Sequence, residues 1–282
     1  MSIIFVGVGA IGLPMALQIK SAGHEVLGVD VADASRERAR RQGIETVAHY
    51  SQAARAETVI VMVATPQQLA ALLEEALPTV SGQHWIIMST VGPDALSAAA
   101  CRLQQAGACV IDAPVTGGTA RACTGELVIF AAGAAAAIGH VTPVLETMGT
   151  VKIVGSEPGE GQGIKVINQH LCAVHIVAAA EALQLARALK LDPAKVLSLV
   201  EGGAAGSWML SDRGPRMLQD TGVSVSSAIN IFVKDSGLVA EAAHACGAAV
   251  PLLQVAHARY QAAAQAGLGQ CDDSRVIETW AQ

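Results

Sequence analysis

The feature that most constrains the fold is a glycine-rich segment within the first dozen residues. Gly7, Gly9 and Gly12 form a Gly-x-Gly-x-x-Gly pattern at the end of an apolar run and before a helical segment. Such a loop leaves space for a pyrophosphate and directs the unpaired N–H groups of a helix N-terminus toward it. The context predicts a dinucleotide-binding βαβ unit; a glycine turn in a nucleotide-free α/β domain is the alternative.

Short apolar runs alternate with alanine-rich helical stretches over about the first 155 residues. The runs lie at residues 3–7, 25–29, 58–63, 85–89, 109–112 and 127–132. Runs of this length between helical segments are typical of buried parallel strands with crossover helices. We therefore predict an α/β fold, with a Rossmann-type doubly wound sheet in an N-terminal domain of residues 1–160.

The character of the sequence changes at residues 155–163, where four glycines and a proline exclude a regular element. Residues 164–190 then contain neither proline nor glycine, and helical patterns follow at 193–200, 229–245 and 252–266. We predict an all-α C-terminal domain, residues 161–282, joined to the first by a long interdomain helix. That helix has few charges, which suggests burial against its own domain or a second subunit, so a homodimer or homotetramer is expected.

Composition excludes several classes of partner. Of the 282 residues 52% are hydrophobic and 15% charged, and the net charge is −6, which gives no basic field for nucleic acid or anionic lipid. We found neither an apolar run of bilayer length nor a secretory signal, so a soluble, cytoplasmic protein without a membrane partner is expected. The six cysteines form no Cys-x-x-Cys pair and are expected to be buried free thiols. His170 and His175 lie on different faces of a helix, so no metal site is expected.

A carboxylate at the end of the second apolar run bears on the choice of cofactor. Asp30 follows Gly12 by eighteen residues, where it can accept hydrogen bonds from the adenosine ribose hydroxyls and repel a 2′-phosphate. This favours NAD over NADP. Arg36 and Arg38 lie just beyond and could receive a phosphate, which keeps NADP as the alternative.

Three further segments are placed where ligands bind in open α/β sheets. Thr65-Pro66 and the segment 89–93 each follow a predicted strand and are candidates to flank the cofactor. Residues 112–118, Asp-Ala-Pro-Val-Thr-Gly-Gly, offer several backbone N–H groups in one bend. Such a bend suits a substrate carboxylate, with an ordinary turn as the alternative.

Lys165 is the strongest catalytic candidate in the second half of the chain. It begins the predicted long helix directly after the glycine-rich segment 159–163, which is expected to be flexible. Its apolar neighbours Ile164, Val166 and Ile167 should disfavour the charged amine and move its pKa toward values useful for proton transfer. Asn168 and Gln169 follow one helical turn later. Taken without the rest of the sequence, Lys165 fits a surface lysine better than a catalytic one.

Five segments together resemble the β-hydroxyacid dehydrogenases, a family that includes 3-hydroxyisobutyrate dehydrogenase and tartronate semialdehyde reductase. They are the glycine loop, Ser89-Thr90, the Asp-Ala-Pro-Val-Thr-Gly-Gly segment, Gly161-x-Gly-x-Lys-x-x-Asn-Gln169 and Phe232-Val-Lys-Asp235, in the family's order over essentially the whole chain. Two departures are Thr116, where serine is commoner, and Lys234-Asp-Ser-Gly in place of Lys-Asp-Leu.

The resemblance implies hydride transfer between a nicotinamide dinucleotide and a small hydroxy acid, with no metal and with Lys165 as the general acid and base. The implied substrate-binding residues are Thr116, Gly117, Gly118, Asn168, Gln169, Ser207 and Trp208. The implied cofactor-binding residues are Gly7, Gly9, Ala10, Ile11, Gly12, Asp30, Val63, Ala64, Thr90 and Lys234.

Within the family, the segments 157–161, 170–176, 206–209 and 231–235 resemble the L-threonate dehydrogenase branch most closely. Ser207 and Trp208 would then line the distal end of a polyhydroxy acid pocket, although Trp208 could instead only pack the domain. Alternative substrates are 3-hydroxyisobutyrate, tartronate semialdehyde and β-hydroxy amino acids. A related imine reductase generally lacks the lysine, and a non-catalytic dinucleotide-binding module would need a partner tail or basic patch that the sequence does not contain.

Overall fold

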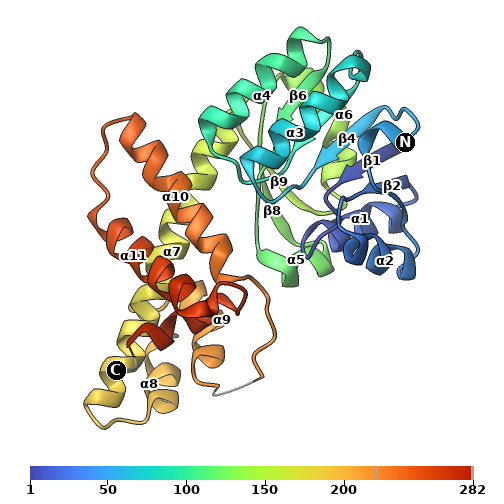
Figure 1. The fold of residues 1–282 in the computed structure, drawn as a ribbon. Coiled ribbons are helices and arrows are strands. Elements are labelled where there is room, and N and C mark those ends of the chain that lie inside the picture. The colour runs from blue at the N-terminus through green and yellow to red at the C-terminus, as the bar shows by residue number, and fades with distance from the viewer. Residues whose placement is uncertain (220–221, 281–282) are drawn as a thin grey trace. The chain divides into compact units, whose positions relative to one another are not determined.

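The structure is a computed structural model that describes residues 1–219 and 222–280 (Figure 1). Its contacts divide the chain into two compact units, residues 1–165 and 166–282. The sequence places this boundary at residue 160, five residues earlier. The first unit is a mixed α/β domain with a predominantly parallel sheet and the second is helical, as predicted.

A single nine-stranded sheet organises the described part of the first unit. Its strands run in the order β3-β2-β1-β4-β5-β6-β8-β7, and β9 pairs with β8. Strand β1 lies between β2 and β4, so the chain leaves the sheet centre in both directions, which is the doubly wound arrangement. The bounds are β1 Ser2–Val6, β2 Glu25–Val29, β3 Glu45–Val47, β4 Thr58–Val61, β5 His84–Ile87, β6 Cys109–Asp112, β7 Val115–Thr116, β8 Leu127–Ala132 and β9 Gly149–Gly155.

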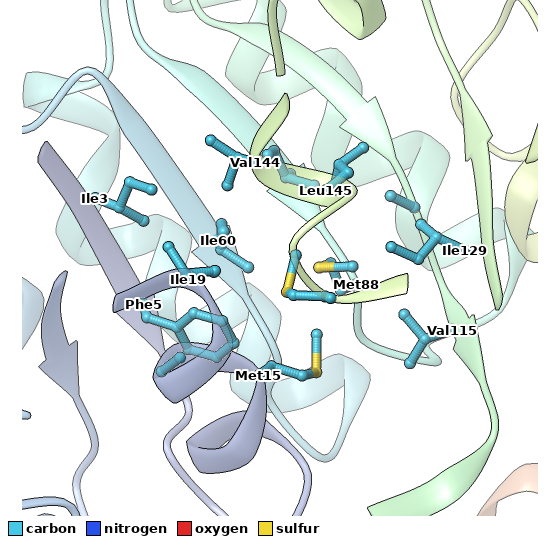
Figure 2. Close-up of a cluster of buried hydrophobic side chains, with 14 of the residues drawn as sticks. Ile3, Phe5, Met15, Ile19, Ile60, Met88, Val115, Ile129, Val144 and Leu145 are labelled. Carbon is cyan, nitrogen blue, oxygen red and sulfur yellow. The ribbon is translucent and has the colours of Figure 1, made fainter. Parts of the chain in front are cut away.

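Apolar residues alternate along the central strands and form one hydrophobic core on each face of the sheet. Ile3 and Phe5 of β1 pack on one face with helices α1 (Gly12–Ser21), α2 (Asp33–Arg41), α5 (Gly118–Thr124) and α6 (Ala135–Leu145). Figure 2 shows side chains from β1, α1, β4, β8 and α6 directed toward one another in this core. Ile4 and Val6 pack on the other face with α3 (Pro66–Ala76) and α4 (Pro93–Gln105). Burial on both faces explains why these strands read as continuous apolar runs.

Two strand assignments from the sequence need correction. The run at 127–132 is a strand, but β8 is antiparallel to β6 rather than parallel to it. Strands β3, β7 and β9 were not predicted, because β3 and β7 are only two or three residues long and β9 carries exposed residues on a sheet edge. Short strands and half-exposed edge strands lack the buried apolar run by which the others are recognised.

The second unit consists of helices in its described residues. Helix α7 (Glu160–Ala188) begins in the first unit, inside the glycine-rich segment that was wrongly expected to contain no regular element. It is followed by α8 (Pro193–Val200), α9 (Trp208–Met217), α10 (Ile229–Ala245), α11 (Pro251–Ala263), a π-helix at Ala264–Leu268 and a 3-10 helix at Asp273–Trp280. The predicted bounds of α8 and α10 are correct. Helix α9 was not predicted, since it contains Gly214 and Pro215, which argue against a helix interior. The Tyr260 hydroxyl of α11 donates to the Ala173 carbonyl oxygen of α7 at 3.0 Å and joins these helices.

The six cysteines are free, but the expectation that they are buried is wrong. Cys101, Cys109, Cys123 and Cys246 are exposed, and Cys172 and Cys271 are partly exposed. The four exposed residues lie on outer helix surfaces, at a strand start and at a helix end, where nothing covers a small side chain. The absence of close cysteine pairs in the sequence therefore predicted their redox state and not their burial.

Helix α7 is also apolar enough to meet the length and composition criteria for a membrane-spanning helix, with a mean hydropathy of 1.4 over its most apolar window. The expectation that no segment reaches bilayer length overlooked this helix, because its apolar residues are interrupted by isolated polar ones. A core helix of a water-soluble protein passes the same test, and 39% of this window is buried. Its composition alone is therefore weak grounds for a membrane span.

A buried ion pair anchors α9 within the second unit. The Arg213 guanidinium donates from Nε and Nη2 to the two carboxylate oxygens of Asp273, at 3.0 and 2.8 Å, and both side chains are almost fully buried. Burial lowers the pKa of Arg213, but attraction to Asp273 and Asp212 raises it by more, so the guanidinium stays charged. The pair fixes α9 against the C-terminal 3-10 helix.

Replacing Asp273 by alanine should lower the free energy of unfolding by about 3 kcal/mol, because Arg213 then loses its fully buried partner and keeps only the partly exposed Asp212. Glu278 offers a matched control, since it forms an ion pair with Arg275 on the same 3-10 helix but is 41% exposed. Glu278→Ala should cost less than about 1 kcal/mol. Urea unfolding followed by circular dichroism measures both variants, and equal losses would contradict the prediction.

Candidate active site

The glycine loop joins β1 to α1, and each glycine has a different steric role. Gly7 has a φ of +92°, and a Cβ there would lie 2.4 Å from the Met62 carbonyl oxygen. A Cβ on Gly12 would lie 1.9 Å from the Gly7 carbonyl oxygen, so Gly12 permits the close approach of α1 to the loop. A Cβ on Gly9 would meet no heavy atom within 4 Å. The space in front of Gly9 is where a pyrophosphate would approach the backbone, and the loop therefore fits a dinucleotide.

Asp30 lies directly after β2, beside the loop, because β2 is the parallel neighbour of β1. Its Oδ1 accepts a hydrogen bond from the Ala32 N–H at 2.9 Å. The Arg36 guanidinium donates to the Asp30 carbonyl oxygen at 2.7 Å and pairs with Asp33. The Arg36 guanidinium is thus engaged with Asp30 and Asp33. Arg38 is exposed, and its Nη2 lies 3.4 Å from the Ser35 hydroxyl oxygen.

The other predicted cofactor-flanking residues follow β4 and β5, at the same edge of the sheet as the glycine loop. Val63 and Ala64 come directly after β4, and the contact of Gly7 with Met62 brings the loop against this segment. Thr65 caps α3 by accepting the Gln68 N–H. Thr90 follows β5, the neighbour of β4. The parallel register gathers the loop, Asp30, Val63, Ala64 and Thr90 at the carboxyl ends of adjacent strands.

The predicted carboxylate-binding bend lies where β7 runs into α5. Thr116 pairs with Val128 in the sheet, Gly117 has a φ of +132° and Gly118 a φ of +66°. A Cβ on Gly117 would lie 2.9 Å from two side-chain carbons of Arg121. The two glycines are therefore required by backbone conformation and packing, and Thr116 is partly exposed beside them.

Asp112 and Gln162 form a buried polar cluster that the sequence analysis did not assign. Asp112, at the end of β6, accepts the backbone N–H groups of Gly159 and Gln162 at its Oδ2, both at 2.9 Å, and the Gln162 Nε2 at its Oδ1 at 3.1 Å. Both residues have no exposed surface. Burial raises the pKa of Asp112 to about 6, and the hydrogen bonds from Gln162, Gly159 and Gly161 offset part of that increase. The only sequence signals were an acidic residue at a strand end and a glutamine between two glycines.

Lys165 lies in the second turn of α7, three residues after Gln162, and is 6% exposed. The surface alternative for this lysine is therefore wrong. Of the apolar neighbours expected to cover it, Val166 is buried, whereas Ile164 and Ile167 are exposed.

Asn168, Gln169 and Lys234 lie in one hydrogen-bonded chain of the second unit. The Asn168 amide donates to Gln169 Oε1 at 2.9 Å, Gln169 Nε2 donates to Asp235 Oδ2 at 2.5 Å, and Lys234 Nζ pairs with Asp235 Oδ1 at 2.8 Å. This chain joins α7 to α10. Lys165, Asn168 and Gln169 share one side of α7, since residues three and four apart are neighbours on a helix surface.

Ser207 and Trp208 begin α9 elsewhere in the second unit. The Ser207 hydroxyl accepts the Leu210 N–H at 3.0 Å as the N-cap of α9. Trp208 is 46% exposed, and its ring lies 5.6 Å from the Arg213 guanidinium carbon. Trp208 therefore does not pack into the hydrophobic core.

One cluster of possible metal ligands lies away from these residues. Donor atoms of Glu57, His84 and His140 are within 4.8 Å of one another at the start of β4 and β5 and on α6. The two imidazole rings are stacked, with centroids 4.2 Å apart and an interplanar angle of 16°, and His140 Nε2 is 2.8 Å from Glu57. His140 thus has a hydrogen-bond partner in Glu57, and the His84 ring stacks on it.

The comparisons with known proteins agree with this geometry. A family model described as the NAD binding domain of 6-phosphogluconate dehydrogenase matches residues 2–156, and one described as the NAD-binding of NADP-dependent 3-hydroxyisobutyrate dehydrogenase matches residues 159–280. The L-threonate dehydrogenase of Cupriavidus necator is 34% identical, over 97% of this chain and 94% of its own length.

Two solved structures have the same fold over nearly the whole chain. The 3-hydroxyisobutyrate dehydrogenase of Salmonella typhimurium superposes with a TM-score of 0.91 at 30% identity and covers 99% of this chain and 100% of its own. That of Mycobacterium tuberculosis, solved with L-serine, has a TM-score of 0.85 at 28% identity, over 100% and 99% of the two chains.

The fold and the glycine loop define an oxidoreductase that uses a nicotinamide dinucleotide. With the full-length relatives, they place the chain more narrowly. The protein belongs to the β-hydroxyacid dehydrogenase family.

Gly9 and Gly12 provide a matched pair of tests for the cofactor loop. Gly9→Ala should leave the unfolding temperature unchanged but weaken NADH binding at least about tenfold, because the methyl group occupies the space needed by the pyrophosphate. Gly12→Ala should lower the unfolding temperature, because its Cβ overlaps the Gly7 carbonyl. Thermal unfolding and NADH fluorescence titration measure both. Wild-type affinity in Gly9→Ala would contradict the assignment of the loop.

Proposed function

We propose that this protein catalyses the NAD-dependent oxidation of a small hydroxy acid, with L-threonate or a related polyhydroxy acid as its substrate. The observation that carries the proposal is the 34% identity with an L-threonate dehydrogenase over 97% of the chain. Its support in the site is the buried Lys165 on α7, one turn from Asn168 and Gln169.

In the proposed reaction Lys165 acts as the general base. Its neutral amine accepts the proton of the substrate hydroxyl while the C–H bond of the carbinol carbon breaks and the carbonyl forms. When bound, NAD supplies the nicotinamide ring that takes up the hydride. In the reverse direction the ammonium group of Lys165 returns a proton to the nascent alkoxide oxygen.

The remaining residues bind and orient the substrate. Thr116, Gly117 and Gly118 would hold its carboxylate through the hydroxyl and the backbone N–H groups of the bend. Asn168 and Gln169 would orient its hydroxyl groups. Lys234 would contact the cofactor, and its ion pair with Asp235 holds the amine in place. Ser207 and Trp208 would contact the distal end of a polyhydroxy acid.

Asp30 supports NAD rather than NADP as the cofactor. A 2′-phosphate placed at the end of β2 would face the Asp30 carboxylate, and the nearby Arg36 is already engaged with Asp30 and Asp33. The exposed Arg38 is the remaining candidate for a phosphate contact, on the outer surface of α2.

A smaller or amino-bearing hydroxy acid is the second candidate substrate. It is favoured by the match to the solved 3-hydroxyisobutyrate dehydrogenases, one of them with L-serine; tartronate semialdehyde and phenylserine are further candidates of this kind. Lys165 argues against imine reduction, and the intact loop and buried lysine argue against a non-catalytic binding module.

We also propose a soluble, cytoplasmic homodimer or homotetramer. Ile167 and Leu171, four residues apart on α7, are 60% and 48% exposed. Apolar side chains so placed on one helix face suit a second subunit.

A substrate and cofactor panel tests the proposal directly. With NAD, the purified protein should oxidise L-threonate in preference to D-threonate, 3-hydroxyisobutyrate, D-glycerate, L-serine and phenylserine, as followed by NADH absorbance. With NADP in place of NAD, kcat/KM should fall by at least about tenfold, since Asp30 repels the 2′-phosphate. Equal efficiencies with the two cofactors would contradict the role of Asp30, and a preference for a smaller acid would replace only the substrate assignment.

Lys165→Ala should lower kcat by about 10² to 10⁴-fold and change the affinity for NADH by less than about twofold, because it removes a proton-transfer group and leaves the cofactor loop intact. Lys152→Ala is a matched control on the exposed face of β9 and should retain wild-type turnover. Stopped-flow kinetics and NADH titration measure both quantities. Near-normal turnover in Lys165→Ala would refute the lysine mechanism.

A further inference from the structure

The buried Asp112–Gln162 cluster has no role in the proton or hydride transfer described above. Its atoms nevertheless connect three segments at the carboxyl edge of the sheet: the end of β6, the loop at residues 89–92 after β5, and the first turn of α7. The loop contains Thr90, and α7 carries Lys165. All of these residues belong to the first compact unit.

The carboxylate of Asp112 caps α7 from a distant part of the sequence. The first N–H groups of a helix have no partner within it; here the N–H of Gln162, and that of Gly159 just before the helix, donate to Asp112 Oδ2. Gly161 makes the approach possible, because a Cβ there would lie 2.9 Å from the same oxygen. A negative charge at this end of a 29-residue helix is also favoured by the helix dipole.

The side chain of Gln162 connects Asp112 to the loop at residues 89–92. Its Oε1 accepts the N–H groups of Val91 and Gly92 at 3.0 and 3.1 Å. These two donors fix the orientation of the amide, so that Nε2 faces acceptors, the Ser89 carbonyl oxygen at 3.0 Å and Asp112 Oδ1 at 3.1 Å. Every hydrogen bond in the cluster thus has one possible direction.

We propose that Asp112 and Gln162 act as positioning residues that set the first turns of α7, and hence Lys165, relative to the loop at residues 89–92. Lys165 follows Gln162 by three residues, so a shift of the first turn moves the amine with it. A misplacement of about 1 Å costs a reaction about 10²-fold. This inference rests on the catalytic role proposed for Lys165.

The fixed hydrogen-bond directions permit a polarity-swap experiment. Asp112→Asn brings an amide NH₂ against the Gln162 NH₂ group, since the hydrogen-bond partners of Asp112 described above are all donors. Gln162→Glu brings a second carboxylate oxygen against Asp112 and the Ser89 carbonyl. In the double variant the amide introduced at position 112 can donate to the carboxylate introduced at position 162. The other oxygen of that carboxylate keeps the Val91 and Gly92 N–H groups, and only the bond to Ser89 is lost.

Each single variant should lower kcat by roughly 10²-fold, with the substrate KM changed by less than about threefold, and the double variant should recover at least about tenfold of the loss. Asp94→Asn is the control, because Asp94 is an exposed carboxylate in the first turn of α4, beside the same loop, and should leave kcat unchanged. All rates are compared at a temperature where thermal unfolding shows every variant folded. Normal kcat in folded Asp112→Asn would overturn the positioning role.

A second measurement does not depend on turnover. Amide hydrogen exchange should speed up together in residues 89–92 and 159–165 in each single variant and slow again in the double variant. Unchanged exchange in both singles would overturn the proposal whatever the enzyme's substrate. If exchange and kcat respond as expected but Lys165→Ala is fully active, the catalytic role of Lys165 fails and these residues position another group.

Discussion

The arrangement of the first unit depends on the hydrogen bonds made by the Asp112 carboxylate, which has no exposed surface. Transfer of an ionised carboxylate out of water is costly unless it is hydrogen-bonded, and Asp112 meets this requirement with N–H groups from the segment that begins α7. The same hydrogen bonds fix the end of the domain. The last strand, β9, is followed by a turn at residues 156–159 and then by α7, whose first turn is held at the sheet edge. The start of α7 is thus joined to the sheet edge through this carboxylate and through the Gln162 amide.

The loops expected to bind the cofactor lie together at the carboxyl edge of the sheet. Parallel strands deliver their carboxyl ends to one side, and the loops after β1, β2, β4 and β5 are each held by short-range contacts there. Gly7 lies against the Met62 carbonyl, Thr65 caps α3, and Gln162 holds the loop after β5. The loop that would receive the pyrophosphate is thus supported by its neighbours.

The strongest sequence predictions concerned features that local physics determines. The glycine loop, the central strands and helices α8 and α10 follow from steric needs and apolar patterns, and they lie where expected. Helix α9 could not be predicted, because tertiary contacts such as the Arg213–Asp273 pair override Gly214 and Pro215. Strands β3 and β7 are too short, and β9 too exposed, to give a buried apolar run. Asp112 and Gln162 were missed for the same reason: a residue that binds partners 47 to 73 positions away has no local pattern.

Trp208, a proposed substrate contact, lies in a different compact unit from the cofactor loop. Its ring lies over the Arg213 guanidinium, which the buried Asp273 fixes, so α9 presents a partly exposed aromatic residue from a rigid base. The glycine loop and Asp30 belong to the other compact unit, where β1, β2 and the Met62 carbonyl hold them. If Ser207 and Trp208 contact the substrate as proposed, changes there would alter the choice of hydroxy acid while the residues that hold the dinucleotide loop stay the same, provided that the Arg213–Asp273 pair remains intact.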